Sequence, residues 1–507
     1  MWRPCRSKGE TLMHRLLIAA LFLAVCGSAA AQTVKIETGT LSGGMSDSVA
    51  VFRNIPYAAP PTGALRWKPP QPAPAWSGTR DATTFGPLCM QVASKDNGVG
   101  PGPASEDCLQ LNVSSPSLSG KAPVMVWVHG GGFVNGSGTA ALYDGTALAK
   151  QGVVVVTLNY RLGRFGFFAH PALTKPGQPT ANYGLMDVIA ALQWVHRNIH
   201  AFGGDPAKVT LFGESAGGIA VNQLMLAPQA RGLFVRAITE SGLGREVPTP
   251  LAAAEIKGAK VAEKLGVKAD QTDAAAALRA IPADVLLAAG DPNIMDADLP
   301  IADGVLVTSS VIDGFKAGRE ARVPFIVGAN DIELPRIAGG YTPGFGGLSA
   351  EQEAGLVAAY GGRAAFEDRY KSDVIFTEPA MTLARLHAAN GSPAYLYRFA
   401  ILSQGAPKFL KGAPHAQERQ YVFETLSASP WKTDAKDAAL AKDVSAYWAA
   451  FARTGRPAPD HLPVWPRFAG ARSVLNFTSE GPVVASPPNQ PALDMIAAKA
   501  DAPPKGR

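Results

Sequence analysis

The sequence predicts an α/β fold in which a mostly parallel β-sheet is covered by helices on both faces. Two runs, Val124–Val128 and Val153–Leu158, are almost wholly apolar, as is typical of central strands that are buried on both sides. The segment Leu185–Ile199 instead places apolar residues three and four positions apart, which is the period of an amphipathic helix. This alternation of buried strand, loop and helix favours parallel strands joined by helical crossovers.

Other elements are expected before and after these three. Val34–Leu41 and Val49–Tyr57 predict short strands at an antiparallel edge, and the alanine-rich residues 246–320 predict a helical cap beyond the sheet. An amphipathic helix with an aromatic stripe is expected near the end of the chain. This helix is expected at Tyr447–Gly455. The remaining predicted strands are Val209–Leu211, Phe234–Glu240, Val323–Val327 and Ala394–Phe399.

One large domain is expected across residues 32–490, with the cap at about 246–320 inserted into it. The chain has 507 residues, and α/β proteins of this size often form a single domain. An apolar content of 47% with 17% charged residues excludes an intrinsically disordered chain. Residues 491–507 are rich in Ala, Pro and Lys and predict a flexible tail.

Residues 1–31 predict a signal peptide. Basic residues precede the apolar run Leu16–Val25, and a cleavage site follows near Ala31. The run is about half the ~20 residues that a spanning helix needs, which disfavours a stable membrane anchor, and the bulky Val25 disfavours a lipoprotein processed at Cys26. Initiation at Met13 instead of Met1 gives a more ordinary signal.

The charge of the processed chain argues against a nucleic-acid partner. Residues 1–31 carry four positive charges and one negative charge, so their removal lowers the formal net charge from +6 to +3. Such a balance provides no extended basic surface for phosphate groups.

A strand–turn–helix pattern surrounds Ser215 in the sequence Gly213-Glu214-Ser215-Ala216-Gly217. A sharp turn of the G-x-S-x-G type holds the serine hydroxyl above the sheet edge in a strained backbone conformation, and side chains at Gly213 or Gly217 would clash. The following helix directs its free N–H groups toward the reacting centre. Ser215 is therefore the candidate nucleophile, and the alternative is a small-residue turn without chemistry.

A glycine run, Gly130-Gly131-Gly132, follows the buried strand and His129. Glycines let the backbone approach a ligand closely, and its N–H groups then stabilise the negative charge that develops on a carbonyl oxygen. The alternatives are a flexible turn and a phosphate loop, although the Lys-Ser/Thr ending of a phosphate loop is missing.

The run Phe202–Gly217 resembles the serine signature of the type-B carboxylesterase (cholinesterase-like) family of α/β-hydrolases. Phe52–Ala58 resembles the N-terminal signature of that family, and Glu106–Val113 resembles its second signature. The likeness extends from about Phe52 to Phe468. It implies an α/β-hydrolase fold, with residues 32–490 as the catalytic domain of an exported bacterial member, either periplasmic or secreted.

The resemblance implies a serine carboxylic-ester hydrolase that acts on a small-molecule ester through an acyl-enzyme. The implied oxyanion-hole donors are the N–H groups of Gly131, Gly132 and Ala216. No cofactor or metal is expected, and the oligomeric state stays open. The alternatives are an acyltransferase on the same triad and, less favoured, a non-catalytic binding protein of the same fold.

His415 is the candidate general base. An ordinary pKa of about 6.5 lets histidine accept and return a proton. His415 lies in a loop after a late strand, and the order Ser215…Glu333…His415 is that of α/β-hydrolases. His129 is the rival base. His196 and His200 have a spacing that suits a metal, but no H-E-x-x-H motif accompanies them.

The acid is expected just after the strand Val323–Val327, where Asp331 and Glu333 both follow. By resemblance the catalytic glutamate falls at Glu333, and Asp331 is the alternative, with a turn or capping role as its other interpretation. The sequence departs from the family pattern in this loop, which lacks the usual Asp-Glu pair, and at Ala416, where glycine is usual.

Cys89 and Cys108 remain after the loss of Cys5 and Cys26 with the signal. An even pair of cysteines in an exported protein predicts one disulfide. The alternative is a pair of buried free thiols.

Overall fold

The structure is a computed structural model. It describes residues 32–92, 94, 98–175, 177–268, 271–289, 300–335 and 347–502. The predicted signal peptide, with its cleavage site near Ala31, lies outside the described residues.

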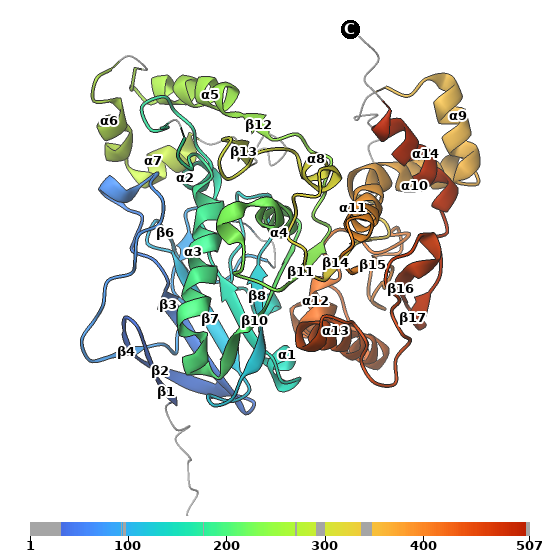
Figure 1. Cartoon of the computed structure of the whole chain (residues 1–507), viewed down its shortest axis with the longest axis horizontal. Coiled ribbons are helices and arrows are strands. Elements are labelled where there is room, and N and C mark those ends of the chain that lie inside the picture. The colour runs from blue at the N-terminus through green and yellow to red at the C-terminus, as the bar shows by residue number, and fades with distance from the viewer. Residues whose placement is uncertain are drawn as a thin grey trace, which may run out of the picture.

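A 13-stranded sheet forms the centre of the described structure (Figure 1). Its strands are connected in the order β1-β2-β3-β7-β9-β8-β10-β11-β14-β15-β16-β17, and β4 pairs with β2. The bounds are β1 Gln32–Ile36, β2 Gly39–Ser46, β3 Val49–Pro56, β4 Thr79–Asp81, β7 Gln110–Ser115, β8 Ala122–Val128, β9 Val154–Leu158, β10 Gly204–Glu214, β11 Arg236–Glu240, β14 Phe325–Asn330, β15 Ala394–Phe399, β16 Val474–Thr478 and β17 Gly481–Val484. Two small pairs lie apart, β5 Leu88–Cys89 with β6 Ala104–Ser105 and β12 Thr249–Pro250 with β13 Ile301–Ala302.

The middle of the sheet, from β9 to β16, is parallel, and its two edges are antiparallel. The exception at the edge is the short β4, which pairs with β2 in parallel. The predicted α/β architecture is therefore confirmed. The single strand expected at Val34–Leu41 is wrong, because a turn between Ile36 and Gly39 folds its two halves into the β1–β2 pair. Because β8, β10, β11 and β14 run in one direction, their carboxyl ends meet at one edge of the sheet.

Side chains alternate along the strands between two cores. Val126 belongs to the core on one face, and its neighbour Trp127 belongs to the core on the other. Helices α3 (Tyr183–Asn198), α4 (Ala216–Leu226), α8 (Val311–Lys316) and α11 (Glu378–Ala389) contribute to the first core. Helices α1 (Thr146–Lys150), α12 (Arg419–Val422) and α13 (Ala435–Thr454) contribute to the second.

The predicted cap region contains α5 (Leu251–Lys264), α6 (Ala274–Ala280) and α7 (Ala283–Ala288), which Figure 1 shows together at one end of the molecule. A short helix, α2 (Gly163–Gly166), lies close to them in the same figure. In the part of the chain that the structure describes, we find no helix with the length and apolarity needed to cross a bilayer.

The flexible tail expected at residues 491–507 is wrong up to residue 502. Residues Gln490–Asp501 form helix α14, which packs with α9 (Ala350–Ala359) and α10 (Arg363–Ser372) around a small apolar core. Alanine has the highest helix propensity, and Ala492 and Ile496 are four residues apart on one buried face. Asp501 adds ion pairs to Arg245 and Lys316. The last residues, 503–507, lie outside the described residues.

Candidate active site

Ser215 occupies a strained turn between β10 and α4. Its backbone has φ +55° and ψ −123°, a region that residues other than glycine rarely adopt. A Cβ atom at Gly217 would lie 2.0 Å from the carbonyl oxygen of Val128, and one at Gly213 would lie 2.7 Å from the backbone of Gly217. The turn therefore requires the two glycines that flank the serine.

Ser215, His415 and Glu333 form a continuous chain of hydrogen-bonding atoms. The Nε2 atom of His415 lies 2.9 Å from Oγ of Ser215, and Nδ1 lies 2.6 Å from Oε2 of Glu333. The Glu333 side chain is fully buried, whereas 30% of the His415 side-chain surface is exposed. The structure thus brings together the three residues that sequence reasoning selected.

Two donors fix the Glu333 carboxylate. The Ser241 hydroxyl donates to Oε1 at 2.5 Å, and the backbone N–H of Asn330 donates to the same oxygen at 2.7 Å. The backbone N–H of His415 also donates to the Glu333 carbonyl oxygen at 2.9 Å. The loop that carries the acid is therefore tied directly to the loop that carries the histidine.

Asp331, the alternative acid, is directed to other partners. Its carboxylate lies 2.7 Å from Nη2 of Arg398 and accepts a hydrogen bond from the N–H of Ala413 at 2.7 Å. Within the described residues it makes no hydrogen bond to His415. Its position supports a structural role, since it connects β15 to the histidine loop.

His129, the alternative base, is buried away from the serine. Its ring stacks on Tyr160 with centroids 4.4 Å apart, and Nδ1 lies 2.8 Å from the carbonyl oxygen of Gly130. Burial lowers the pKa of His129 to about 4. His196 and His200 lie exposed on the surface, and in the described ranges no cluster of three or more His, Cys, Asp or Glu side chains has the geometry of a metal site.

The glycine loop lies directly against Ser215. A Cβ atom at Gly130 would lie 3.1 Å from Cβ of Ser215, and Gly131 and Gly132 have φ values of +102° and +60°. Among the described residues, no hydrogen bond uses the amide N–H of Gly131, Gly132 or Ala216 as its donor. These N–H groups are therefore available to a negatively charged oxygen.

Gly131→Ala is expected to lower kcat more than it raises KM. The added Cβ would lie 2.2 Å from the carbonyl oxygen of Asn135 and would displace the loop. The loss of one oxyanion donor costs roughly 3–4 kcal/mol in the transition state. Gly152→Ala is the control and should keep full activity, because Gly152 also has a positive φ (+86°) but no atom of the described residues lies within 4 Å of its Cβ position. A change in KM alone would show that the loop lines the substrate pocket and does not stabilise the oxyanion.

Further carboxylates surround His415. Oε1 of Glu214 lies 3.2 Å from its Nε2 atom, and the buried Glu418, to which Asn330 donates a hydrogen bond, also acts on His415 through its charge. The buried Glu240, to which Trp448 donates a hydrogen bond, interacts in turn with Glu418 and Glu214. Burial alone would lower the pKa of His415, but the charges of Glu333 and Glu214 raise it to about 9. Burial and the charge of Glu214 raise the pKa of Glu418 to about 8.

Glu214→Gln is expected to shift the acidic limb of the kcat/KM profile to lower pH. Histidine acts as a base only when neutral, and kcat/KM reports the pKa of the free enzyme. Removal of the Glu214 charge lowers the pKa of His415, so the neutral form persists at lower pH. Glu480→Gln is the control, since this exposed residue contacts Lys436 instead. An unmoved limb, or one moved to higher pH, would contradict the electrostatic role of Glu214.

The predicted disulfide between Cys89 and Cys108 is present.

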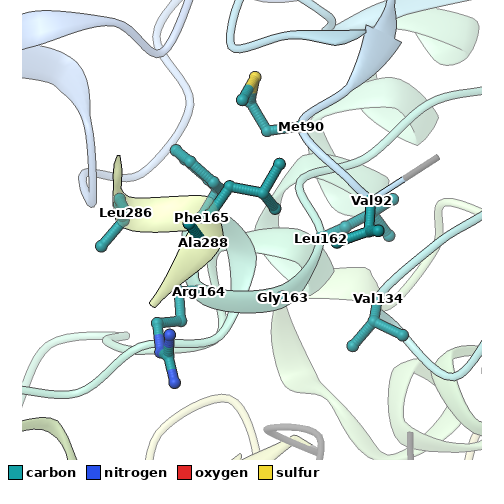
Figure 2. Close-up of a pocket in the computed structure, with 10 residues that line it drawn as sticks. Met90, Val92, Val134, Leu162, Gly163, Arg164, Phe165, Leu286 and Ala288 are labelled. Atoms are coloured by element: carbon teal, nitrogen blue, oxygen red, sulfur yellow. The ribbon is translucent and has the colours of Figure 1, made fainter. Parts of the chain in front are cut away.

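A mostly apolar cavity of about 210 Å³ lies close to this disulfide in the sequence. It is lined by Met90 and Val92, which follow Cys89, and by Val134, which follows the glycine loop. Figure 2 shows that the cavity walls come from separate segments, which also include Leu162–Phe165 after β9 and Leu286–Ala288 of α7.

The model of the Carboxylesterase family matches residues 30–354 and 363–495. The chain belongs to the carboxylesterase family. It is 37% identical to fumonisin B1 esterase of Sphingopyxis macrogoltabida, over 89% of this chain and 88% of that one. It is 34% identical to para-nitrobenzyl esterase of Bacillus subtilis (strain 168), over 93% of this chain and 99% of that one.

Solved structures give the same assignment. A PNB esterase structure aligns with a TM-score of 0.78 at 32% identity, over 92% of this chain and 99% of the other. A carboxylesterase of Geobacillus stearothermophilus aligns with a TM-score of 0.76, also at 32% identity, over 91% and 99%. The α/β-hydrolase fold is therefore confirmed. Membership of the family and the esterase relatives also identify this chain as a carboxylic-ester hydrolase.

Sequence reasoning missed several contacts of the site. Ser241 directly follows a predicted strand, and its place at the carboxyl end of that strand was a usable signal. Glu214 lies inside the serine motif, but nothing in the motif shows which way its side chain points. Phe376, whose ring lies against His415, has no local signal, because its segment is far from the motif residues in the sequence.

Proposed function

We propose that the carboxylesterase cleaves its substrates through an acyl-enzyme on Ser215, with His415 as general base and Glu333 as its partner acid. The observation that carries this proposal is the hydrogen-bond chain Ser215 Oγ–His415 Nε2 and His415 Nδ1–Glu333 Oε2, at 2.9 and 2.6 Å. A serine hydroxyl is a weak nucleophile until a neighbouring base accepts its proton. Glu333 orients the imidazole and stabilises its cationic form.

In the first half-reaction, Oγ of Ser215 attacks the ester carbonyl carbon while Nε2 of His415 takes its proton. The carbonyl oxygen becomes an oxyanion, which the N–H groups of Gly131, Gly132 and Ala216 stabilise. Collapse of this intermediate breaks the ester bond, and the departing alkoxide receives the proton from His415. In the second half-reaction, a water molecule gives a proton to Nε2 of His415 and attacks the acyl carbon. Collapse of this second intermediate breaks the bond from the acyl carbon to Oγ of Ser215 and releases the carboxylic acid, while His415 returns the proton to Oγ.

We also propose that the enzyme works outside the cytoplasm, after cleavage of the signal peptide near Ala31. The Cys89–Cys108 disulfide supports this location, since disulfides persist in oxidising compartments. Small-molecule esters are the proposed substrates, in keeping with the names of relatives such as para-nitrobenzyl esterase.

The test is a panel of p-nitrophenyl esters of rising acyl length, beside polycarboxylate esters, on the purified processed chain. A burst of p-nitrophenol equal to the enzyme concentration, followed by release of free acid, is the expected result. The absence of turnover on every ester would contradict the proposal. Transfer of the acyl group to an added alcohol in preference to water would instead identify an acyltransferase.

A further inference from the structure

The chain between α10 and α11 forms a π-helical turn, Asp373–Thr377. Such turns are rare and often occur at functional sites, because the inserted residue rotates the side chains around it. This turn places the largely buried ring of Phe376 against the imidazole of His415, with centroids 5.0 Å apart and planes at 44°.

The same segment also touches the loop of Glu333. The hydroxyl of Ser372, which directly precedes the turn, accepts a hydrogen bond from the backbone N–H of Leu334 at 3.0 Å. Leu334 is the residue after Glu333, so a few consecutive residues contact both partners of the candidate triad, His415 through a ring and Glu333 through its neighbouring backbone.

A buried carboxylate anchors the turn. The side chain of Asp373 is 1% exposed and accepts hydrogen bonds from the Tyr360 hydroxyl at 2.7 Å and from the Asn489 side-chain amide. Tyr360 directly follows α9, and Asn489 directly precedes α14. Figure 1 shows α9, α10 and α14 side by side, and their shared apolar core includes Val374 of the turn.

We propose that the π-helical turn is a positioning element of the active site and that Phe376 is the positioning residue of His415. This inference rests on the proposed roles of Ser215, His415 and Glu333. Two hydrogen bonds hold opposite edges of the imidazole, but they leave its plane free to tilt about the line between them. The ring of Phe376 packs on the imidazole and removes this freedom. Asp373 holds the turn in place through its hydrogen bonds to Tyr360, after α9, and Asn489, before α14.

The test compares Phe376→Leu with the control Phe366→Leu. Phe366, on α10, is also a buried ring (0% exposed, against 8% for Phe376), and it stacks on Tyr370 instead of His415. Three quantities are measured for each variant: kcat and KM with p-nitrophenyl acetate, the rate at which methanesulfonyl fluoride sulfonylates Ser215, and Tm. Methanesulfonyl fluoride presents one methyl group, so its reaction depends on the geometry of Ser215 and His415 and needs no pocket wall.

Phe376→Leu is expected to lower kcat and the sulfonylation rate together by roughly ten- to a hundredfold, since misplacement by about 1 Å costs this much. KM for the acetate ester should change little. The control should lower Tm but leave the sulfonylation rate unchanged. Phe376→Met, which keeps most of the side-chain volume, is the second variant in case the leucine variant does not fold, and it should show the same loss.

An unchanged sulfonylation rate in the Phe376 variants would overturn the inference. If KM for longer acyl esters then rose, Phe376 would be a pocket wall, and if only Tm fell, it would be a packing residue. A wild-type chain that methanesulfonyl fluoride does not modify at Ser215 would overturn the proposed function itself and this inference with it.

Discussion

Ser215→Ala is expected to reduce ester turnover by several orders of magnitude and to leave the fold intact. The loss of the nucleophile in comparable triads costs about 10⁶ in kcat. The side chain of Ser215 makes no capping hydrogen bond to α4, so its removal does not weaken the helix. The measurement is kcat/KM of the purified variant from a host without esterases, beside its thermal unfolding curve.

Ser445→Ala provides the matched control for this experiment. Ser445 is a hydrogen-bonded serine as well, and its hydroxyl accepts from the side-chain amide of Gln151. It is fully buried, whereas Ser215 is partly exposed, and it lies on α13, on the second core. Its replacement should affect stability more than activity. Substantial turnover by the pure Ser215→Ala variant would move the nucleophile to another residue.

Glu333→Gln is expected to lower kcat by about 10⁴, the loss seen when the acid of such a triad becomes an amide. An amide at this position offers an N–H group to Nδ1 of His415 and so favours the wrong tautomer. Asp331→Asn, in contrast, should retain most of its kcat and lose stability instead, because it weakens the ion pair that the mostly buried Arg398 forms.

The two amide variants are compared in kcat and in Tm. The opposite pattern, with a large loss of kcat in Asp331→Asn and a small one in Glu333→Gln, would assign the acid to Asp331. It would also contradict the hydrogen bond between Glu333 and His415 as the functional contact.

Local patterns predicted those parts of the site that depend on neighbouring residues. The serine turn and the glycine loop both follow buried strands. Each requires glycine at particular positions, and those glycines are visible in the sequence beside the strand. His415 and Glu333 required the order of the chain and the resemblance to a family. The contacts of Ser241, Glu214 and Phe376 join segments that are distant in the sequence, so only the folded chain reveals them.

The errors in the predicted fold have a similar physical origin. The C-terminal residues were interpreted from their composition, whereas helix α14 exists because α9 and α10 supply a partner for its apolar face. The sequence predicts a single short strand at Val34–Leu41, whereas pairing of its two halves folds this segment into a hairpin. In both places tertiary packing decided the outcome.

The most direct test of the central claim is peptide mapping by mass spectrometry after inactivation with a small organophosphate. The account predicts one adduct per chain, on Ser215, formed in proportion to the loss of esterase activity and absent from the Ser215→Ala variant. Complete inactivation with the adduct on another residue, or full activity with Ser215 modified, would contradict it.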